Sequence, residues 1–172
     1  MVKRRLIAFC ALMAFVTLIP LAGVPVSVSI GTWQAVESFG PSAGVHGMVG
    51  ATVAVAPWLE VETSAIVQFT PVVGGSLMGS LALNIPLASA LYDDEDSAML
   101  YYNAMASVGA LGGWDRLHDR PVGAVFIRLT PLMLGGPYYR ARERSAALGV
   151  LYDLFDHSFK VFWNLLAFDR YL

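Results

Sequence analysis

Between Arg5 and Arg116 the chain contains no lysine or arginine, although this stretch is rich in apolar residues. A helical membrane protein needs basic residues in its cytoplasmic loops. The other structure that can cross a bilayer is a closed β-barrel, whose backbone groups pair between strands and to which no such charge rule applies. The missing basic residues therefore favour a barrel, which should show alternation of apolar and polar residues.

The first 22 residues have the form of a secretory signal peptide. A basic start at residues 3–5 is followed by an apolar core over 6–18 and by helix-breaking and small residues from Pro20 onward. Because this core is shorter than the roughly 20 residues of a spanning helix, a cleaved signal is favoured over a retained anchor. We predict cleavage near residue 22 and a barrel domain over 23–172.

Charge and cysteine content narrow the function classes. Removal of the signal takes away three of the eleven basic residues and leaves eight against thirteen acidic ones, a net charge of −5. Such a chain lacks the basic footprint of a nucleic-acid-binding protein. The single cysteine, Cys10, lies in the signal, so the mature chain is expected to be free of cysteine.

Alternation is clearest over residues 59–70, where apolar residues such as Val67 fall on one side of an extended strand and polar residues such as Ser64 on the other. Leu83 and Ala82 alternate in the same way in the next run. Val67 and Leu83 should therefore face lipid, and Ser64 and Ala82 should face the lumen.

Similar runs recur along the chain, separated by clusters of glycine, proline and acidic residues that are typical of turns. Their lengths suit tilted membrane strands of about 9–11 residues, and their number is even, as in bacterial barrels. The eight predicted strands are 26–36, 45–55, 59–70, 76–87, 98–109, 122–130, 145–154 and 159–168.

Two other folds were weighed. A polytopic helical protein remains an alternative, but a helix over 63–92 would contain Pro71, Pro86 and three glycines, at a cost of several kcal/mol. A soluble β-sandwich would leave the outward apolar faces unexplained.

The segments 147–154 (ALGVLYDL) and 56–62 (APWLEVE), with a signal followed by alternating strands, resemble the small eight-stranded outer-membrane barrels of the OmpA, OmpX and OmpW type. The resemblance covers essentially the whole mature chain. It implies an all-β, antiparallel, up-and-down transmembrane barrel in the outer membrane of a diderm bacterium, exported through the periplasm and inserted by the barrel-assembly machinery. Many members end on an aromatic residue that this machinery reads. Here Leu172 is last, so Phe168 or Tyr171 would take that role.

A periplasmic start fixes the expected topology. It places outer loops near 37–44, 70–76, 112–121 and 155–158, and inner turns near 56–58, 88–97 and 131–144. Seven aromatic residues fall near the inner boundary, where amphipathic rings prefer to sit. This predicted girdle consists of Trp58, Tyr92, Tyr101, Tyr102, Tyr138, Tyr139 and Tyr171.

The lumen of an eight-stranded barrel is only wide enough for side chains to fill. We expect a polar layer near the inner turns, in which Arg128 pairs with Glu60 or Glu62 because a buried charge needs a partner. We favour a plug in which the polar groups pair with each other. The functional alternative is a gate that opens a narrow conduit. The predicted members are Glu60, Glu62, Asn84, Asn103 and Arg128.

The third predicted outer loop repeats an Asp-Arg pair around a histidine and is the candidate interaction site. His118 with Asp115 or Asp119 has the composition of an acid–base pair in a lipid-modifying enzyme, but the loop holds no serine nucleophile. A solvated, mutually neutralising charge cluster is favoured. The interaction candidates are Trp114, Asp115, Arg116, His118, Asp119 and Arg120.

The other charged clusters give no ligand site. The acidic run 93–96 lacks the ligand spacing and glycine of a calcium loop, and Arg140, Arg142 and Arg144 are expected to form a solvated flank of the last inner turn. The three histidines are not spaced as metal ligands. We therefore predict no catalytic residue, no metal and no cofactor.

The leading hypothesis is an integral, non-enzymatic outer-membrane barrel. One option within this hypothesis is that small or apolar molecules pass through a narrow conduit in the barrel. The alternative is a surface-exposed structural or interaction protein that acts through its outer loops. Outer-membrane lipid and the assembly machinery are the expected partners, with small solutes or loop-binding proteins as further options.

Overall fold

The computed structural model describes the backbone of residues 26–35, 45–56, 58–70, 72–94, 97–136 and 141–171, and the side chains of 27–34, 45–56, 58–70, 72–87, 104–134 and 143–170. The predicted signal peptide and first outer loop lie outside these residues. The regular elements of the described chain are all strands, so the helical alternative is wrong. Among the described residues, no helix is long and apolar enough to span a bilayer.

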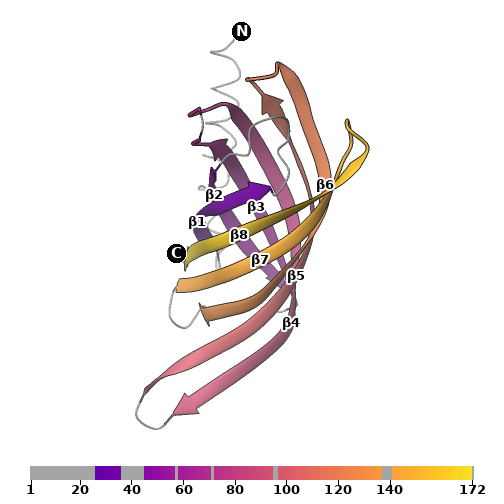
Figure 1. The fold of residues 1–172 in the computed structure, drawn as a ribbon. Helices are drawn as coiled ribbons and strands as arrows, with labels where there is room; N and C mark the ends of the chain where they lie inside the picture. Colours follow the sequence, from indigo (N-terminus) through magenta and orange to yellow (C-terminus); the bar gives the residue numbers. More distant parts are fainter. Residues whose placement is uncertain are drawn as a thin grey trace.

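Eight antiparallel strands form a closed barrel in which each strand pairs with its neighbours in sequence and β1 pairs with β8 (Figure 1). This confirms the predicted up-and-down barrel. The strands are β1 (Val26–Ala35), β2 (His46–Ala56), β3 (Leu59–Gln68), β4 (Ser76–Asp94), β5 (Ser97–Asp115), β6 (Arg120–Gly136), β7 (Ala141–Asp153) and β8 (Ser158–Tyr171). We call the end with the turns 69–75, 116–119 and 154–157 the outer end, and the opposite end the inner end.

The hairpin of β4 and β5 is longer than predicted. Most of the expected inner turn 88–97 is strand, because β4 continues to Asp94 and β5 starts at Ser97. Pairing of β3 with β4 stops at Glu60 and Asn84, and pairing of β5 with β6 is described as far as Tyr102 and Leu134. The hairpin therefore extends past its neighbours at the inner end (Figure 1).

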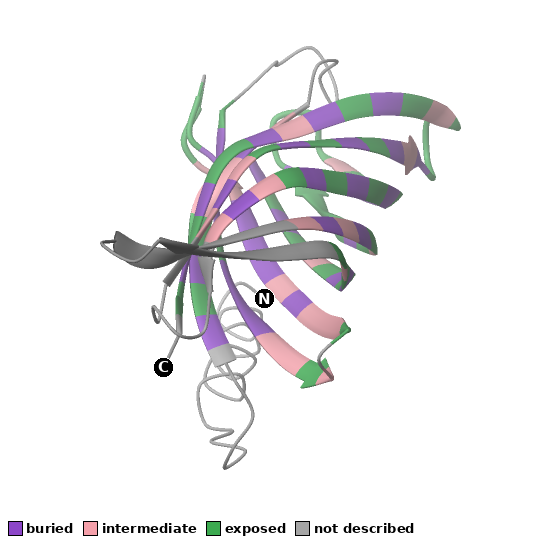
Figure 2. Cartoon of the chain, turned by 90° about the horizontal axis from the view of Figure 1, so that it is seen from below, coloured by how far each residue is buried: buried purple, intermediate pink, exposed green. Residues whose placement is uncertain are grey.

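Buried and exposed residues alternate along the strands (Figure 2). Ser64 and Ala82 are buried in the lumen, Leu83 is exposed on the outward face and Val67 is half-buried there, as predicted. Large apolar side chains are exposed on every strand except β3, whose outward valines are half-buried. Examples in chain order are Ile30, Val55, Leu81, Val108, Ile127, Leu148 and Phe159.

The alternation slips by one residue on three adjacent strands near the inner end. Consecutive lumen-facing residues are three apart instead of two on β6, β7 and β8: Thr130 and Met133, Arg144 and Ala147, Asn164 and Ala167. The three strands keep one register with each other, and the pairing shifts by one residue only where they meet their neighbours, between β5 and β6 and between β8 and β1. Such a register shift is a β-bulge, which re-aims side chains and tolerates the missing N–H of proline. Pro131 lies within the slip on β6, and Ala146 on β7 has a left-handed φ of 52°.

Candidate functional site

Glu62 is the centre of a buried ionic cluster in the inner half of the lumen. Arg128 grips its carboxylate with both guanidinium Nη atoms, with Nη2 3.0 Å from Oε2 and Nη1 3.3 Å from Oε1. Arg144 donates to the same Oε2, and the Asn84 amide donates to it at 3.0 Å. The expected pairing of Arg128 is thus made with Glu62, in the bidentate geometry that gives charge-assisted hydrogen bonds their strength.

Further partners complete the cluster. Arg144 Nη2 donates to Asp169 Oδ1 at 2.9 Å, and Arg128 Nη2 also reaches Asn84 Oδ1 at 3.3 Å and Ser107 Oγ at 3.2 Å. Among the described residues, two cations therefore face two anions, which is the balance that buried charges require. We call this group the inner ionic cluster: Glu62, Asn84, Ser107, Arg128, Arg144 and Asp169.

The middle of the lumen is filled by apolar side chains. Phe162 stacks on Trp33 with ring centroids 5.8 Å apart and meets the Phe126 ring edge-on at 5.6 Å. Inward glycines make room for these rings, since a Cβ on Gly149 would lie 2.3 Å from the Phe162 ring. We call this layer the apolar plug: Trp33, Met48, Ile66, Met78, Ala82, Leu111, Val122, Ala124, Phe126, Leu151, Phe162 and Ala167.

Two of the outer turns, 116–119 and 154–157, are stabilised by buried aspartates that cap the backbone. Asp115 Oδ1 accepts from the backbone N–H groups of Leu117 and His118, and its Oδ2 lies 2.7 Å from His118 Nδ1. The expectation of a solvated cluster is wrong for Asp115, which is only 3% exposed. An aspartate that accepts hydrogen bonds from the backbone two and three residues ahead stabilises a turn. Stabilisation of the turn therefore explains why Asp115 and His118 lie together.

The last outer turn repeats this construction. Asp153 Oδ1 accepts from the backbone N–H groups of Phe155 and Asp156, and its Oδ2 binds Lys160 Nζ at 2.8 Å. Arg120 Nη1 bonds to Asp156 Oδ1 at 3.2 Å, which ties the two turns together. We call this group the outer ionic network: Asp115, His118, Arg120, Asp153, Asp156 and Lys160.

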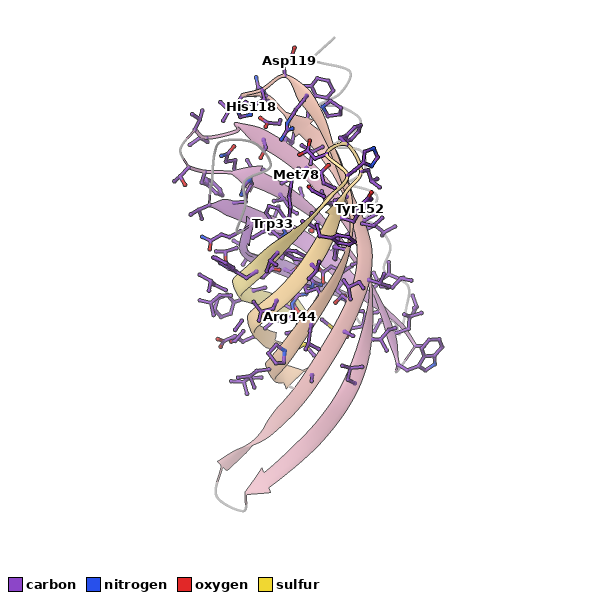
Figure 3. The ribbon with its side chains drawn as sticks, turned by 45° about the vertical axis from the view of Figure 1, so that its right-hand side comes forward. Trp33, Met78, His118, Asp119, Arg144 and Tyr152 are labelled. Carbon is purple, nitrogen blue, oxygen red and sulfur yellow. The ribbon has the colours of Figure 1, made fainter. Side chains whose placement is uncertain are left out.

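Figure 3 places these layers along the barrel, with His118 and Asp119 at one end, Met78 and Trp33 below them and Arg144 further towards the other end. Next to the plug, His46 Nε2 and Ser76 Oγ form a buried hydrogen bond of 3.0 Å, and the His46 ring meets Trp33 edge-on. Buried polar groups normally need such partners. The described part of the lumen therefore holds an ionic group towards each end and apolar side chains between them.

The remaining predicted residues take no part in the hydrogen bonds given above, although Glu60 lies opposite Asn84 in the pairing of β3 with β4. Glu60 is half-buried one step closer to the inner end, and the side chain of Asn103 lies outside the described residues. Trp114 is on the outward face of β5, where its Nε1 donates to Asp119 Oδ1 at 3.3 Å, and Arg116 is exposed in the turn. Of the predicted aromatic girdle, only the side chain of Trp58 is described, and it is exposed.

Sequence reasoning missed Arg144, Asp169 and Ser107. The prediction that Arg144 is a solvated turn residue is wrong, because β7 begins at Ala141 and the guanidinium group is buried. A strictly alternating β7 would turn Arg144 outward, and the slip at Ala146 turns it inward. Pro131 on the adjacent strand was the available signal, since proline within a sheet marks an edge or a bulge.

Among the described residues, no group of three or more His, Cys, Asp or Glu side chains is placed to hold a metal ion. Comparison of the chain with protein-family models, with curated proteins and with solved structures found no match. The functional conclusion therefore depends on the barrel and on its contacts.

Proposed function

We propose that this chain is an integral, non-enzymatic β-barrel protein of a diderm outer membrane, with a lumen that is closed in its resting state. The proposal includes export by the N-terminal signal and insertion by the barrel-assembly machinery. The observation that carries it is the chemistry of the outward face.

The outward face is apolar between the two ends of the barrel. With Arg170 at the inner end excepted, every residue that is exposed on the described strands is apolar or glycine. The other exposed charged residues of the described part, Arg116, Asp119 and Asp156, all lie in the outer turns. A water-soluble barrel would expose polar side chains over this surface, whereas lipid requires apolar ones.

The height of this surface suits a bilayer. Exposed leucines on β4 run from Leu77 to Leu87, ten residues along the strand. At about 3.3 Å per residue and a tilt of about 40°, that length spans about 25 Å, the height of the apolar band in outer-membrane barrels.

The three filled layers favour a closed barrel over a standing pore. A conduit would need both the Arg128–Glu62 pair and the stacked rings of Trp33 and Phe162 to move apart. Passage of small or apolar molecules is therefore a function only of a rearranged state. The outer turns 116–119 and 154–157 have four residues each and offer little surface for a large partner.

Arginine substitution at two exposed leucines tests membrane insertion. Leu83 lies in the apolar band and Leu117 in an outer turn. Leu83→Arg should reduce folding into lipid vesicles, with a cost of about 2–4 kcal/mol near mid-bilayer. Leu117→Arg is the matched control and should fold as the parent does.

Folding is followed by heat-modifiable migration on gels and by the β-type circular-dichroism spectrum of the vesicle-bound chain. Equal tolerance of arginine at both positions, together with a folded barrel in plain buffer, would contradict the proposal. In that case the apolar face would not be in contact with lipid.

A further inference from the structure

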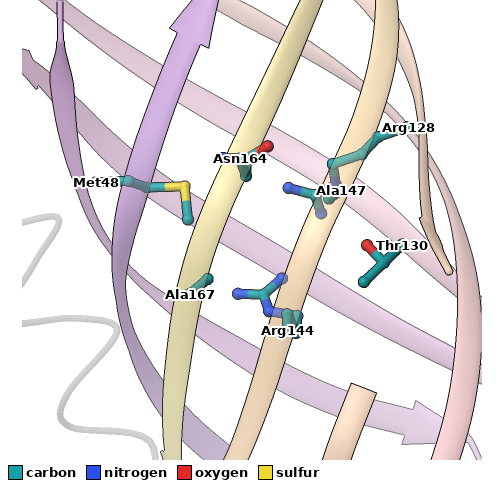
Figure 4. Close-up of a pocket in the computed structure, with 7 residues that line it drawn as sticks. All are labelled: Met48, Arg128, Thr130, Arg144, Ala147, Asn164 and Ala167. Carbon is teal, nitrogen blue, oxygen red and sulfur yellow. The ribbon is translucent and has the colours of Figure 1, made fainter. Parts of the chain in front are cut away.

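A small cavity lies in the lumen where the inner ionic cluster meets the apolar plug (Figure 4). Its volume is about 10 Å³, which is at the lower limit of the accessible space that one ordered water molecule needs. Side chains from β2, β6, β7 and β8 line it: Met48, Arg128, Thr130, Arg144, Ala147, Asn164 and Ala167.

Among these side chains, Arg128, Thr130 and Asn164 each carry a buried polar atom for which the described residues provide no partner. The atoms are Nε of Arg128, Oγ1 of Thr130 and Oδ1 of Asn164. All three residues are at least nine-tenths buried, and buried polar atoms in folded proteins are nearly always hydrogen-bonded. The Asn164 amide nitrogen is already used, because it donates to the Thr32 carbonyl at 2.8 Å.

The chemistry of the three atoms selects the ligand. The Nε–H of Arg128 donates, the Asn164 oxygen accepts, and the Thr130 hydroxyl can do both. An anion would be repelled by the amide oxygen, and a metal ion would be repelled by two guanidinium groups. Glu62 and Asp169 form ion pairs with both of these groups, so the described residues leave the cavity no charge to neutralise.

We propose that this cavity binds one ordered water molecule, which accepts from Arg128 Nε and donates to Asn164 Oδ1 and Thr130 Oγ1. The water links β6 to β8 across β7 and holds the Arg128 side chain in the orientation that grips Glu62. It extends the inner ionic cluster to the edge of the apolar plug. This inference does not depend on the membrane setting.

Ala147 offers a matched test, because it lines the cavity and its side chain is buried. Threonine and valine have nearly the same shape and differ in one hydroxyl group. In Ala147→Thr the hydroxyl should replace the water, whereas Ala147→Val should expel the water and leave the polar atoms without partners. The folding equilibrium constant of the threonine variant should exceed that of the valine variant by about tenfold.

Ala124 is the control, because it is buried in the apolar plug and does not line the cavity. There the order should reverse, so Ala124→Val should be at least as stable as Ala124→Thr. A valine variant at 147 as stable as the threonine variant, or more stable, would show that the cavity is dry and overturn the proposal.

The parent chain gives a second measurement if the substituted chains do not fold. Nuclear magnetic resonance of the detergent-folded barrel should show a cross-peak between the side-chain amide of Asn164 and a long-lived water. A folded parent whose assigned Asn164 amide shows no such cross-peak would equally overturn the proposal.

Discussion

Removal of charges from the inner ionic cluster should destabilise the barrel in an order set by the number of partners each residue has. Glu62 receives hydrogen bonds from Arg128, Arg144 and Asn84, whereas Arg128 has Glu62 as its one carboxylate partner among the described residues. Breaking a buried pair by removing one partner costs about 3–5 kcal/mol. The variants Arg128→Ala and Glu62→Ala should fall at opposite ends of this range.

Arg128→Ala leaves Glu62 with Arg144 and Asn84, so the carboxylate is not stranded, and we expect a loss of about 3 kcal/mol. Glu62→Ala leaves the buried Arg128 with only Asn84 and Ser107, and we expect about 5 kcal/mol. The double variant should lose about 2 kcal/mol less than the two single losses combined, because Arg128 without Glu62 is an unmatched buried cation.

Urea unfolding of the vesicle-inserted barrel, followed by tryptophan fluorescence, measures these free energies. Trp33 is buried in the apolar plug and should report its opening. Arg120→Ala is the matched control, because Arg120 belongs to the outer ionic network and its loss should add to that of Glu62→Ala within about 0.5 kcal/mol. Strictly additive losses for Arg128 and Glu62 would refute the coupling and the plug that depends on it.

Three further predictions test the local geometry by the same unfolding measurement. A Cβ on Gly113 would lie 2.1 Å from the Leu77 carbonyl oxygen, whereas the nearest atom at Gly112 is 3.8 Å away. Gly113→Ala should therefore cost about 1–3 kcal/mol and Gly112→Ala should be neutral or stabilising; equal effects would show that the register of β5 is wrong. Ala146 has a left-handed φ, so Ala146→Gly should stabilise the barrel by about 1 kcal/mol, whereas Ala110→Gly, where β5 pairs regularly with β4 and β6, should destabilise it; a loss at Ala146 would argue against the left-handed backbone at this position. Asp153→Ala removes two backbone caps and the Lys160 partner and should cost about 2–3 kcal/mol, whereas Asp153→Asn keeps the caps and should cost about 1 kcal/mol; an equal loss in both would show that the caps contribute nothing.

The number and order of the strands were predictable, because one face of each strand is apolar and the alternation has a period of two. The pairing of Arg128 followed from the same alternation, since it places Glu62 and Arg128 in one narrow lumen. The length of the β4–β5 hairpin was not predictable, because the acidic run that ends β4 has the composition of a turn.

The slip in the alternation on β6, β7 and β8 was the main structural feature that the sequence did not predict. Period-two reasoning turns Arg144 and Asp169 outward, and a slip of one residue moves both into the lumen. Asp115 was identified as a candidate and Asp153 was not. The role of both as turn caps depends on backbone geometry that residue type alone does not specify.

The central claim is that the barrel spans the membrane with its lumen closed by the inner ionic cluster and the apolar plug. Conductance across a planar lipid bilayer tests this most directly, with insertion verified on the same preparation by heat-modifiable migration. The account predicts no steady current above that of the bare bilayer for the inserted parent. A stable open-channel current from the parent barrel would contradict it.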